Sequence, residues 1–321
     1  MFWARTLIAH TAPVRRRADH ARHTVTLLDK AIAAYLGLAI GDALGATVEF
    51  LTPNEIRHQY GLHRDLIGGG WLRLKAGQVT DDTTMSLALG EAILANGGVD
   101  AKTVAEAFDA WMRAKPVDIG NTVRRNLIQF RKTENPEAPA SEHDAGNGAA
   151  MRVLPVALGT YGQTPEITRA ASRAQAHVTH HNTLSDAACE TLIFMVHDLL
   201  AGHDVLEVRQ QHAEKLVHQY PIFAFDKKRR DNPSGYVVET IQAVFQAFFT
   251  THSFEDCLID VVNRGGDADT TGAIAGMLAG ARYGQEAIPK RWLKAIARTT
   301  SEQCSEQARA LLAVLRRRGA A

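Results

Sequence analysis

The stretch VVETIQAVFQAFF, residues 237–249, decides the fold class of this chain. Its large apolar residues recur three and four positions apart, which is the spacing of one face of an α-helix. The turn Asn232-Pro233-Ser234-Gly235 precedes it. Residues 104–112 repeat the spacing behind Asp100, a residue type that caps helix N-termini. Both stretches therefore predict amphipathic helices.

Segments of this kind follow one another from about residue 28, and the alternating runs typical of β-strands are nearly absent. Connections are short, with no long linker and no fixed-period repeat. We therefore predict an all-α protein with a single domain. Further helices are expected at residues 29–44, 82–96, 119–132, 147–158, 166–178, 184–201, 205–219, 254–261, 268–283, 287–298 and 302–317.

Residues 1–28 differ from the rest, because Arg and His dominate their polar positions. A targeting peptide is one interpretation, but the apolar start is short and no small-residue cleavage signal follows it. We interpret residues 1–28 as a loose N-terminal extension, or as the product of an upstream start. The predicted domain then covers residues 29–321.

The composition of the 321 residues excludes several classes of protein. With 36 Lys and Arg against 35 Asp and Glu, the net charge of +1 lacks the basic excess of a nucleic-acid binder. The 45% apolar content is too high for a disordered chain. The three cysteines have no metal-ligand spacing and are expected to be reduced core residues. No apolar run reaches the ~18–20 residues of a membrane span, so we expect a cytoplasmic protein.

Four short segments gather Gly, Asp, Asn and Thr at predicted helix ends. They are 41–45 (GDALG) with Glu49 beyond it, 80–85 (TDDTTM), 146–152 (GNGAAMR) and 265–272 (GGDADTTG). One Asp or Thr before an apolar run is an ordinary N-cap. Paired carboxylates exceed that need, because like charges ~4 Å apart cost about 4 kcal/mol at an effective dielectric constant near 20. The clustered acids therefore predict a bound cation.

The donor types indicate which cation. Carboxylate and hydroxyl oxygens, without Cys or paired His at ligand spacing, suit Mn²⁺ or Mg²⁺ rather than zinc. Asp42 can equally cap a helix or bond locally, so it stays outside the predicted ligand set.

The spacing of the acids bears on how many cations bind. Residues two apart in a helix point about 200° apart, so Asp267 and Asp269 can share a cation only if the helix begins after them. The glycines before Asp267 permit such a start. Asp81 and Asp82 are adjacent, point in different directions and could hold two neighbouring ions. We predict a dinuclear metal cleft with ions ~3.5–4 Å apart.

In this order, the four segments resemble the signature of the ADP-ribosylglycohydrolase family. The resemblance spans about residues 29–318, and 265–272 is its most specific part. The stretch IGGGWLRL at 67–74 is similar to the dinitrogenase reductase activating glycohydrolases in particular. The resemblance implies a single-domain, all-α fold of this type around two Mn²⁺ or Mg²⁺ ions. It also implies hydrolysis of the N-glycosidic bond between ADP-ribose and an arginine of a modified protein.

The resemblance implies site residues at the matching positions. The metal ligands would be Thr80, Asp81, Asp82, Asp267, Asp269 and Thr270. Within 118–122 (DIGNT), Asp118 would be the reacting carboxylate, and Asn121 and Thr122 would face the substrate. Glu142 and His180 match further substrate-side positions, and Tyr236 would stack on or bond to the nucleotide.

The chemistry suits these residues independently of the family. Cleaving an N-glycoside builds positive charge on the ribose, which nearby carboxylates stabilise, while metals fix the ribose hydroxyls and can activate a water. Glu49 and Asp118 are both candidates for the general acid/base or for trapping the anomeric carbon, and Asp118 could instead be the N-cap of the 119–132 helix. Asn147 could bind phosphate oxygens through backbone N–H groups at the start of the 147–158 helix, although Gly-Asn-Gly equally describes a turn.

Three functions are open from the sequence. The leading one is a hydrolase that reactivates ADP-ribosylated dinitrogenase reductase, the nitrogenase iron protein. The alternatives are a hydrolase of another conjugate, such as ADP-ribosyl-serine or O-acetyl-ADP-ribose, and a non-catalytic ADP-ribose-binding module. The resemblance further implies contact with a PII-type signal protein, peripheral membrane association only through partners, and no nucleic acid.

Overall fold

The computed structural model describes residues 25–318, so residues 1–24 of the predicted extension lie outside the described residues. The helices are α1 (Leu27–Gly45), α2 (Pro53–Tyr60), α3 (Asp81–Asn96), α4 (Ala101–Arg113), α5 (Asn121–Thr133), α6 (Leu154–Gly159), α7 (Pro165–Ala176), α8 (Thr183–Ala201), α9 (Val205–Val208), α10 (Glu214–Gln219), α11 (Val237–Thr250), α12 (Phe254–Val262), α13 (Ala268–Tyr283), α14 (Lys290–Ala295) and α15 (Arg298–Arg318). A π-helical turn, Arg209–Ala213, joins α9 to α10. In this part of the chain, β pairing is limited to two isolated bridges, which confirms the all-α prediction.

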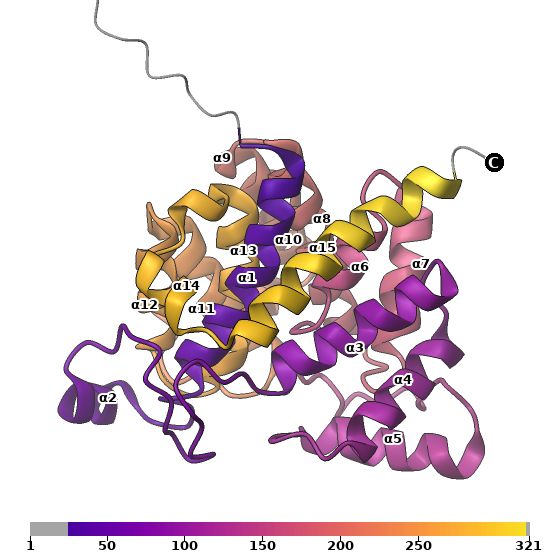
Figure 1. Cartoon of the computed structure of the whole chain (residues 1–321), viewed down its shortest axis with the longest axis horizontal. Helices are drawn as coiled ribbons and strands as arrows, with labels where there is room; N and C mark the ends of the chain where they lie inside the picture. The colour runs from indigo at the N-terminus through magenta and orange to yellow at the C-terminus, as the bar shows by residue number, and fades with distance from the viewer. Residues whose placement is uncertain (1–24, 319–321) are drawn as a thin grey trace, which may run out of the picture.

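Helices α1 and α13 pack together at the centre of the molecule (Figure 1). Their facing pairs are Gly37 with Gly276, Gly41 with Gly272, and Gly45 with Ala268. The pairing runs in opposite directions along the two chains, so the helices are antiparallel. A Cβ atom on any of these three α1 glycines would lie only 1.9–2.1 Å from a carbonyl oxygen of α13. The contact therefore requires glycine, and it brings the two backbones unusually close.

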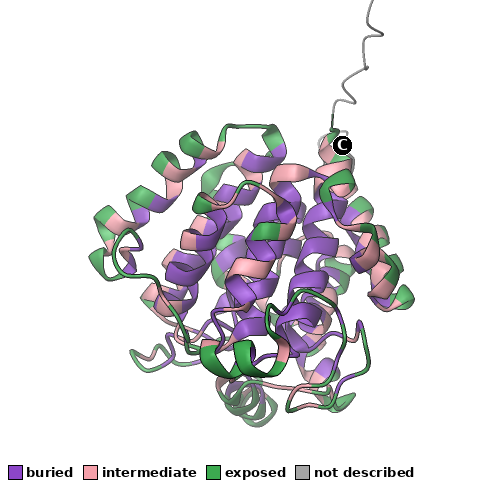
Figure 2. Ribbon diagram, turned by 90° about the vertical axis from the view of Figure 1, so that its left-hand side faces the viewer, coloured by how far each residue is buried: buried purple, intermediate pink, exposed green. Residues whose placement is uncertain are grey.

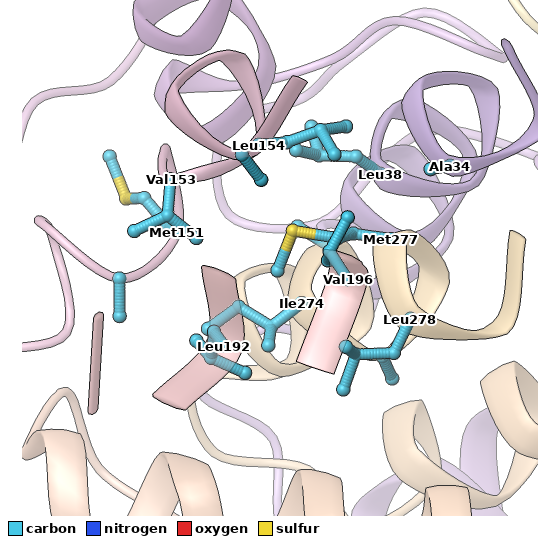
Figure 3. Packing of buried hydrophobic residues seen from close by; sticks show 14 of the residues in the cluster. Ala34, Leu38, Met151, Val153, Leu154, Leu192, Val196, Ile274, Met277 and Leu278 are labelled. Carbon is cyan, nitrogen blue, oxygen red and sulfur yellow. The ribbon is translucent and has the colours of Figure 1, made fainter. Parts of the chain in front are cut away.

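The core surrounds this pair of helices. Nearly every residue of α1 and α13 is buried, and the outer helices expose only their outward faces (Figure 2). Leu38 of α1, Leu154 of α6, Val196 of α8 and Met277 of α13 pack in one cluster (Figure 3). Helices that are apolar all round are expected at such a position. Within residues 25–318, no helix combines the length and the hydropathy that crossing a bilayer requires.

The helix predicted at 147–158 is shorter than expected. Residues 147–152 form turns, and α6 begins only at Leu154. Pro155 lies in the first turn of α6, and proline is well tolerated in a helix only there, because it lacks an N–H and clashes with the preceding turn. The position of the proline therefore sets the start of the helix.

Two other differences lie near the chain's surface. Helix α2 was not expected, because only Ile56 is buried in it and its apolar pattern is weak. Its signal is the capping box of Thr52 and Glu55. The helix predicted at 287–298 is only α14, because Ile296 is extended and α15 then begins at Arg298.

The C-terminal end of α1 and the N-terminal ends of α3 and α13 lie close together. Asp42, near the end of α1, accepts hydrogen bonds from the backbone N–H groups of Thr80 (3.0 Å) and Thr83 (3.1 Å) and so caps α3 from outside. Phe50, beyond α1, donates its N–H to the carbonyl of Gly266 just before α13 (2.7 Å). Gly266 has a φ of 66°, and a Cβ there would lie 2.1 Å from Pro233 O, so this turn requires glycine. The acidic segments at 42, 81–82 and 267–269 are thereby brought together.

Candidate active site and metal centre

A cavity of about 430 Å³ opens where these helix ends meet. The predicted site residues that line it are Glu49, Asp81, Asp82, Asp118, Asn121, Thr122, Asn147, His180, Asp267, Asp269 and Thr270. They come from segments that are far apart in the sequence. Folding therefore gathers most of the predicted site at one cavity.

Three predicted residues do not line this cavity. Thr80 is fully buried behind the acidic residues, with Oγ1 3.4 Å from Asp82 Oδ2 and 3.4 Å from Asp269 Oδ2. Glu142 is exposed in the turn before Asn147. Tyr236 is paired with Gly146 through an isolated bridge, and its side chain is not part of the lining. The substrate roles of Glu142 and Tyr236 stay predictions.

The acidic residues form one connected cluster. Glu49, Asp267 and Asp269 each offer a carboxylate oxygen within 4.8 Å of the others. The hydroxyl of Thr270 lies 3.4 Å from Asp82 Oδ2, which links the start of α13 to the start of α3. The carboxylate and hydroxyl oxygens thus converge on one volume.

Helix α13 begins at Ala268, between Asp267 and Asp269, which confirms the range of 268–283 predicted from the sequence. Asp267 is the N-cap, with φ −77° and ψ 68°, and Asp269 lies in the first turn. Because Asp267 is not helical, the 200° separation of two helical residues does not apply to this pair. The two carboxylates can therefore face the same cavity even though Asp269 lies within the helix.

No basic side chain of residues 25–314 forms an ion pair with a carboxylate of this cluster. Burial and the neighbouring acids raise the pKa of Asp81 to about 7 and raise the pKa values of Asp82 and Asp269 well above their usual range. A buried carboxylate without a counter-charge is unfavourable unless it is protonated or coordinates a metal.

The surroundings of one oxygen atom, Asp82 Oδ1, show whether a metal ion fits the cluster. Asp82 Oδ1 is buried and has no hydrogen-bond partner among the described residues, which is rare for a polar atom in a folded protein. Its surroundings supply oxygen donors from Asp81, Asp269 and Thr270 and no thiol. This donor set fits a hard divalent cation such as Mn²⁺ or Mg²⁺.

Glu49 and Asp118 differ in their surroundings. Glu49 Oε2 accepts a hydrogen bond from Trp71 Nε1 (2.7 Å). Burial raises the pKa of Glu49 to about 8, although this hydrogen bond acts to lower it. Asp118 is half-buried, and burial raises its pKa although Ile119 N–H donates to its Oδ1 (2.7 Å). Gly120, not Asp118, is the N-cap of α5, so the alternative interpretation of Asp118 as that cap is wrong.

His180 presents a hydrogen-bond donor to the cavity. Thr179 Oγ1 accepts a hydrogen bond from Arg152 Nη2 (2.8 Å), so its own hydrogen is free to donate to His180 Nδ1 (2.8 Å). Burial and the nearby Arg152 and Arg125 lower the pKa of His180 to about 3, so the ring is neutral. In the tautomer that accepts the Thr179 hydroxyl hydrogen at Nδ1, the ring hydrogen lies on Nε2, beside Gly146 and Gly148 in the cavity lining.

Asn147 acts differently from the prediction. Its backbone N–H donates to Gly235 O (3.0 Å) and is not free for a phosphate. Its side-chain Nδ2 donates to Asp267 Oδ2 (2.8 Å) and to Thr240 Oγ1 (2.9 Å). Asn147 therefore orients a carboxylate of the acidic cluster.

Phe50 and Trp71 line the cavity but were not predicted as site residues. Trp71 belongs to the stretch 67–74, which pointed only to the family. Nothing in the periodicity of the sequence shows that this loop folds back beside Glu49.

Comparison with known proteins agrees with this architecture. The family model of ADP-ribosylglycohydrolase matches residues 23–321. The chain is 51% identical over 286 residues to the ADP-ribosyl-[dinitrogen reductase] glycohydrolase of Rhodospirillum rubrum, covering 89% of this chain and 96% of that protein. It is 36% identical over 279 residues to the ADP-ribosylarginine hydrolase Tri1 of Serratia proteamaculans, covering 83% of this chain and 75% of that protein.

A solved structure described as an ADP-ribosylglycohydrolase-related protein complex superposes with a TM-score of 0.80 at 34% identity. The match covers 90% of this chain and 98% of the solved chain. The family match, over residues 23–321, includes all the segments that build the cavity.

Proposed function

The chain belongs to the ADP-ribosylglycohydrolase family, and from this premise we propose that it removes ADP-ribose from an arginine side chain of a modified protein. We propose dinitrogenase reductase, the nitrogenase iron protein, as that protein, because the Rhodospirillum rubrum relative carries this substrate in its name. The observation in the fold that supports hydrolysis is the buried acidic cluster without a counter-charge at the cavity.

We propose that two Mn²⁺ or Mg²⁺ ions bind among Thr80, Asp81, Asp82, Asp267, Asp269 and Thr270. When bound, such ions supply positive charge that fixes hydroxyl groups of the ribose and can activate a water. The unpartnered Oδ1 of Asp82 and the absence of basic partners for the cluster among the described residues support this assignment. Asn147 would hold Asp267 in its orientation through the 2.8 Å hydrogen bond.

The remaining residues fit the bond that breaks. Cleavage at the anomeric carbon leaves positive charge on the ribose, which the carboxylate of Asp118 stabilises when ionised. Glu49, with its pKa raised to about 8, can hold a proton at neutral pH and give it to the leaving guanidine nitrogen. His180 Nε2–H can donate to a substrate oxygen. Either Glu49 or Asp118 can then take the proton of the attacking water.

A direct assay tests the proposal. The purified chain is incubated with Mn²⁺ and either ADP-ribosylated iron protein or an ADP-ribosyl-arginine peptide, and released ADP-ribose is measured. We expect release from both, none with EDTA present, and recovery on adding Mn²⁺ back. Absence of release would overturn the proposal. Binding of ADP-ribose without release would then indicate a non-catalytic binding module, and release only from ADP-ribosyl-serine or O-acetyl-ADP-ribose a different substrate.

Other expectations from the sequence stay predictions. They are the boundary between an extension at 1–28 and a domain at 29–321, a cytoplasmic location, and contact with a PII-type signal protein. A pull-down with purified PII-type protein, with and without its nucleotide ligands, would test the last of these.

A further inference from the structure

We propose that Phe50 and Trp71, together with Glu49, form a subsite for the guanidinium group of the modified arginine. This inference rests on the proposed function and extends it, because it identifies the residues that distinguish an arginine conjugate from other ADP-ribose conjugates. The subsite would take a planar cation attached to the ribose.

The two aromatic side chains stand at the cavity and remain open to solvent. Phe50 is 63% exposed and Trp71 is 53% exposed, although both line the cavity. Their ring centroids are 5.6 Å apart, with an interplanar angle of 43°. Exposed large aromatic residues beside a cavity are candidates for ligand contact, because much of their apolar surface stays open to solvent.

The backbone holds Phe50 in place at a cost. Its φ of 64° is unfavourable for a bulky residue other than glycine. The hydrogen bonds Phe50 N–H to Gly266 O (2.7 Å) and Gly266 N–H to Leu51 O (3.0 Å) fix this conformation. Strained residues held in this way concentrate at functional sites.

Trp71 is held from two sides. Gly70, just before it, packs so closely on the end of α1 that a Cβ would lie 2.3 Å from Ala46 O. The indole Nε1–H donates to Glu49 Oε2 at 2.7 Å. A carboxylate oxygen is therefore fixed at the edge of the indole ring.

This combination suits a guanidinium group. Planar guanidinium stacks on aromatic faces and also donates paired N–H groups to a carboxylate. Phe50 and Trp71 supply the faces, and the carboxyl group of Glu49 supplies oxygens that accept N–H groups in either protonation state. A serine hydroxyl or an acetyl group has neither the positive charge nor the N–H fork, so it gains little from this arrangement.

An adenine ring could also stack on aromatic residues, but the charges here oppose it. The diphosphate that accompanies adenine would lie near the carboxylates of Glu49 and Asp267, whose oxygens lie within 4.8 Å of each other. Another part of the same lining offers donors, namely His180 Nε2–H and the backbone at the start of α5. The diphosphate is better accommodated there, which leaves the aromatic pair to the arginine.

The test compares three variants: Trp71→Leu, Trp71→Phe and Phe50→Leu. We measure kcat/KM for an ADP-ribosyl-arginine peptide and the Kd for ADP-ribose, which lacks the guanidinium. Leu62→Ala is the matched control, because Leu62 is 57% exposed in the same segment and does not line the cavity. Thermal unfolding checks that every variant is folded.

We expect Trp71→Leu to lower kcat/KM about tenfold and Phe50→Leu to lower it about threefold, with the Kd for ADP-ribose and the Leu62→Ala enzyme unchanged. Trp71→Phe keeps an aromatic face but loses the N–H to Glu49, and should recover most of the activity. Equal losses in Trp71→Phe and Trp71→Leu would show that Trp71 only positions Glu49. A parallel loss of ADP-ribose affinity would place the pair on the nucleotide, and no loss at all would remove the subsite.

Failure of the proposed function would be recognised separately. If the wild-type chain releases no ADP-ribose, the affinity for the intact ADP-ribosyl-arginine peptide decides the inference. A weaker Kd for that peptide in Trp71→Leu, at unchanged ADP-ribose affinity, would uphold the guanidinium subsite. An unchanged Kd would overturn it.

Discussion

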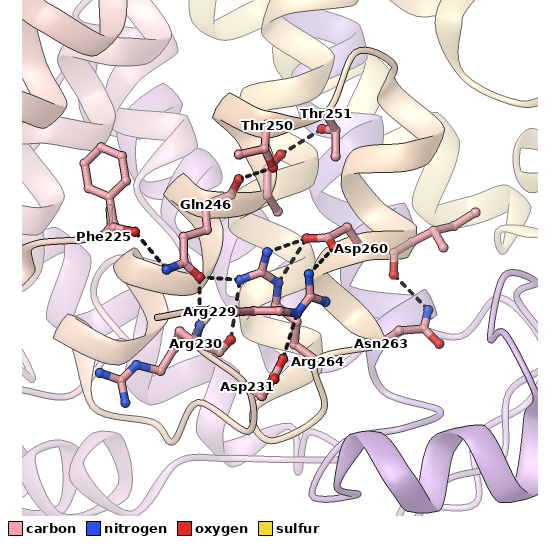
Figure 4. A network of polar contacts seen from close by, with 12 residues as sticks. Phe225, Arg229, Arg230, Asp231, Gln246, Thr250, Thr251, Asp260, Asn263 and Arg264 are labelled. Carbon is pink, nitrogen blue, oxygen red and sulfur yellow. Dashed lines mark hydrogen bonds and ion pairs between the residues drawn. The ribbon is translucent and has the colours of Figure 1, made fainter. Parts of the chain in front are cut away.

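Two charged regions of this protein are built in opposite ways. At the cavity, carboxylates from the starts of α3 and α13 face one another, and no basic side chain in the described part of the chain pairs with them. Behind α11 and α12, a network of arginine, glutamine and aspartate side chains matches its charges (Figure 4). The uncompensated charges at the cavity suit the binding of an external cation, whereas the compensated charges of the network stabilise the fold.

The network shows the contrast in detail. The Arg264 side chain is only 3% exposed, and its Nη2 lies 2.5 Å from Asp260 Oδ2 while Nη1 donates to Gln246 Oε1 (2.6 Å). Arg229 Nη1 adds a second contact to Asp260 at 2.7 Å. The basic run 227–230 thus supplies Arg229, whose side chain is 49% exposed, to the outer part of this network. In the acidic cluster, by contrast, Asp82 Oδ1 has no hydrogen-bond partner in the part of the chain that the structure describes.

The largest expected effect comes from removing charge at the cavity. Asp82→Asn keeps the shape of the side chain and removes a proposed metal ligand. We expect hydrolysis to fall about 10³-fold, equivalent to about 4 kcal/mol of transition-state stabilisation. The metal-free variant should be at least as stable as the wild type, because a buried like charge is gone. ADP-ribose release and thermal unfolding with and without Mn²⁺ measure both. A Mn²⁺-induced Tm shift equal to that of the wild type would contradict the assignment.

The matching change in the network should have the opposite effect on stability. Asp260→Asn leaves the buried Arg264 guanidinium without its charge partner, so we expect the free energy of unfolding to fall by about 3 kcal/mol. Activity per folded molecule should stay the same, because Asp260 does not line the cavity. Urea unfolding and the hydrolysis assay at low temperature measure the two quantities. An unchanged free energy of unfolding would show that pairing Arg264 with Asp260 does not stabilise the fold.

A smaller effect is expected from a residue that orients the acidic cluster. Asn147→Ala removes the hydrogen bond to Asp267 Oδ2 and should weaken Mn²⁺ binding about 10- to 100-fold. Thr240→Val is the control, because it removes the other partner of the Asn147 amide and leaves Asp267 untouched. Mn²⁺ titration followed by calorimetry measures the affinity. Equal affinities in Asn147→Ala and the wild type would show that Asp267 needs no orienting partner.

The smallest effect concerns His177, a basic group that is paired with two carboxylates and that loses its positive charge when the pH rises. His177 Nε2 lies 2.9 Å from Asp186 and Nδ1 lies 3.2 Å from Glu137. Burial opposes protonation, but these two carboxylates prevail and raise the pKa of His177. A raised pKa means that the folded state holds the proton more tightly than the unfolded state. The resulting stabilisation is fully present below the unfolded pKa of about 6.5 and is lost as pH rises through the folded value.

We therefore expect His177→Gln to lower the free energy of unfolding by about 1 kcal/mol at about pH 5.5 and by much less at about pH 8.5. Urea unfolding of both proteins at the two pH values gives the difference, in which contributions from titrating groups remote from His177 cancel. A difference that grows with pH would show that His177 is neutral in the fold.

The helices could be predicted wherever an apolar face is long and regular. Helices α4, α8 and α11 lie close to their predicted ranges, because burial of one face dominates their energetics. Helix α2 was missed because capping, not burial, defines it, and the start of α6 was misplaced because Pro155 was not weighed. The glycines of α1 and α13 are visible in the sequence, but their pairing depends on which helices meet.

The acidic part of the site could be predicted because like charges are costly and their excess is visible in the sequence. Asp81, Asp82 and Asp269 do line one cavity. The direction of a side chain is not visible in this way. Glu142 and Tyr236 are close in the sequence to residues that line the cavity, but their own side chains are not part of the lining.

The sequence by itself determined an all-α chain, its family and the acidic residues that need a cation. Helical periodicity and repulsion between adjacent carboxylates are local properties of the chain, and the family follows from the order of the motifs along it. Only the tertiary structure decided which charges are compensated. It joined Arg264 to Asp260, left Asp82 Oδ1 without a partner, and placed Trp71 beside Glu49. The physical reason is that electrostatic and aromatic contacts depend on distances of a few ångströms between segments, and the close glycine contact of α1 with α13 sets those distances at the cavity.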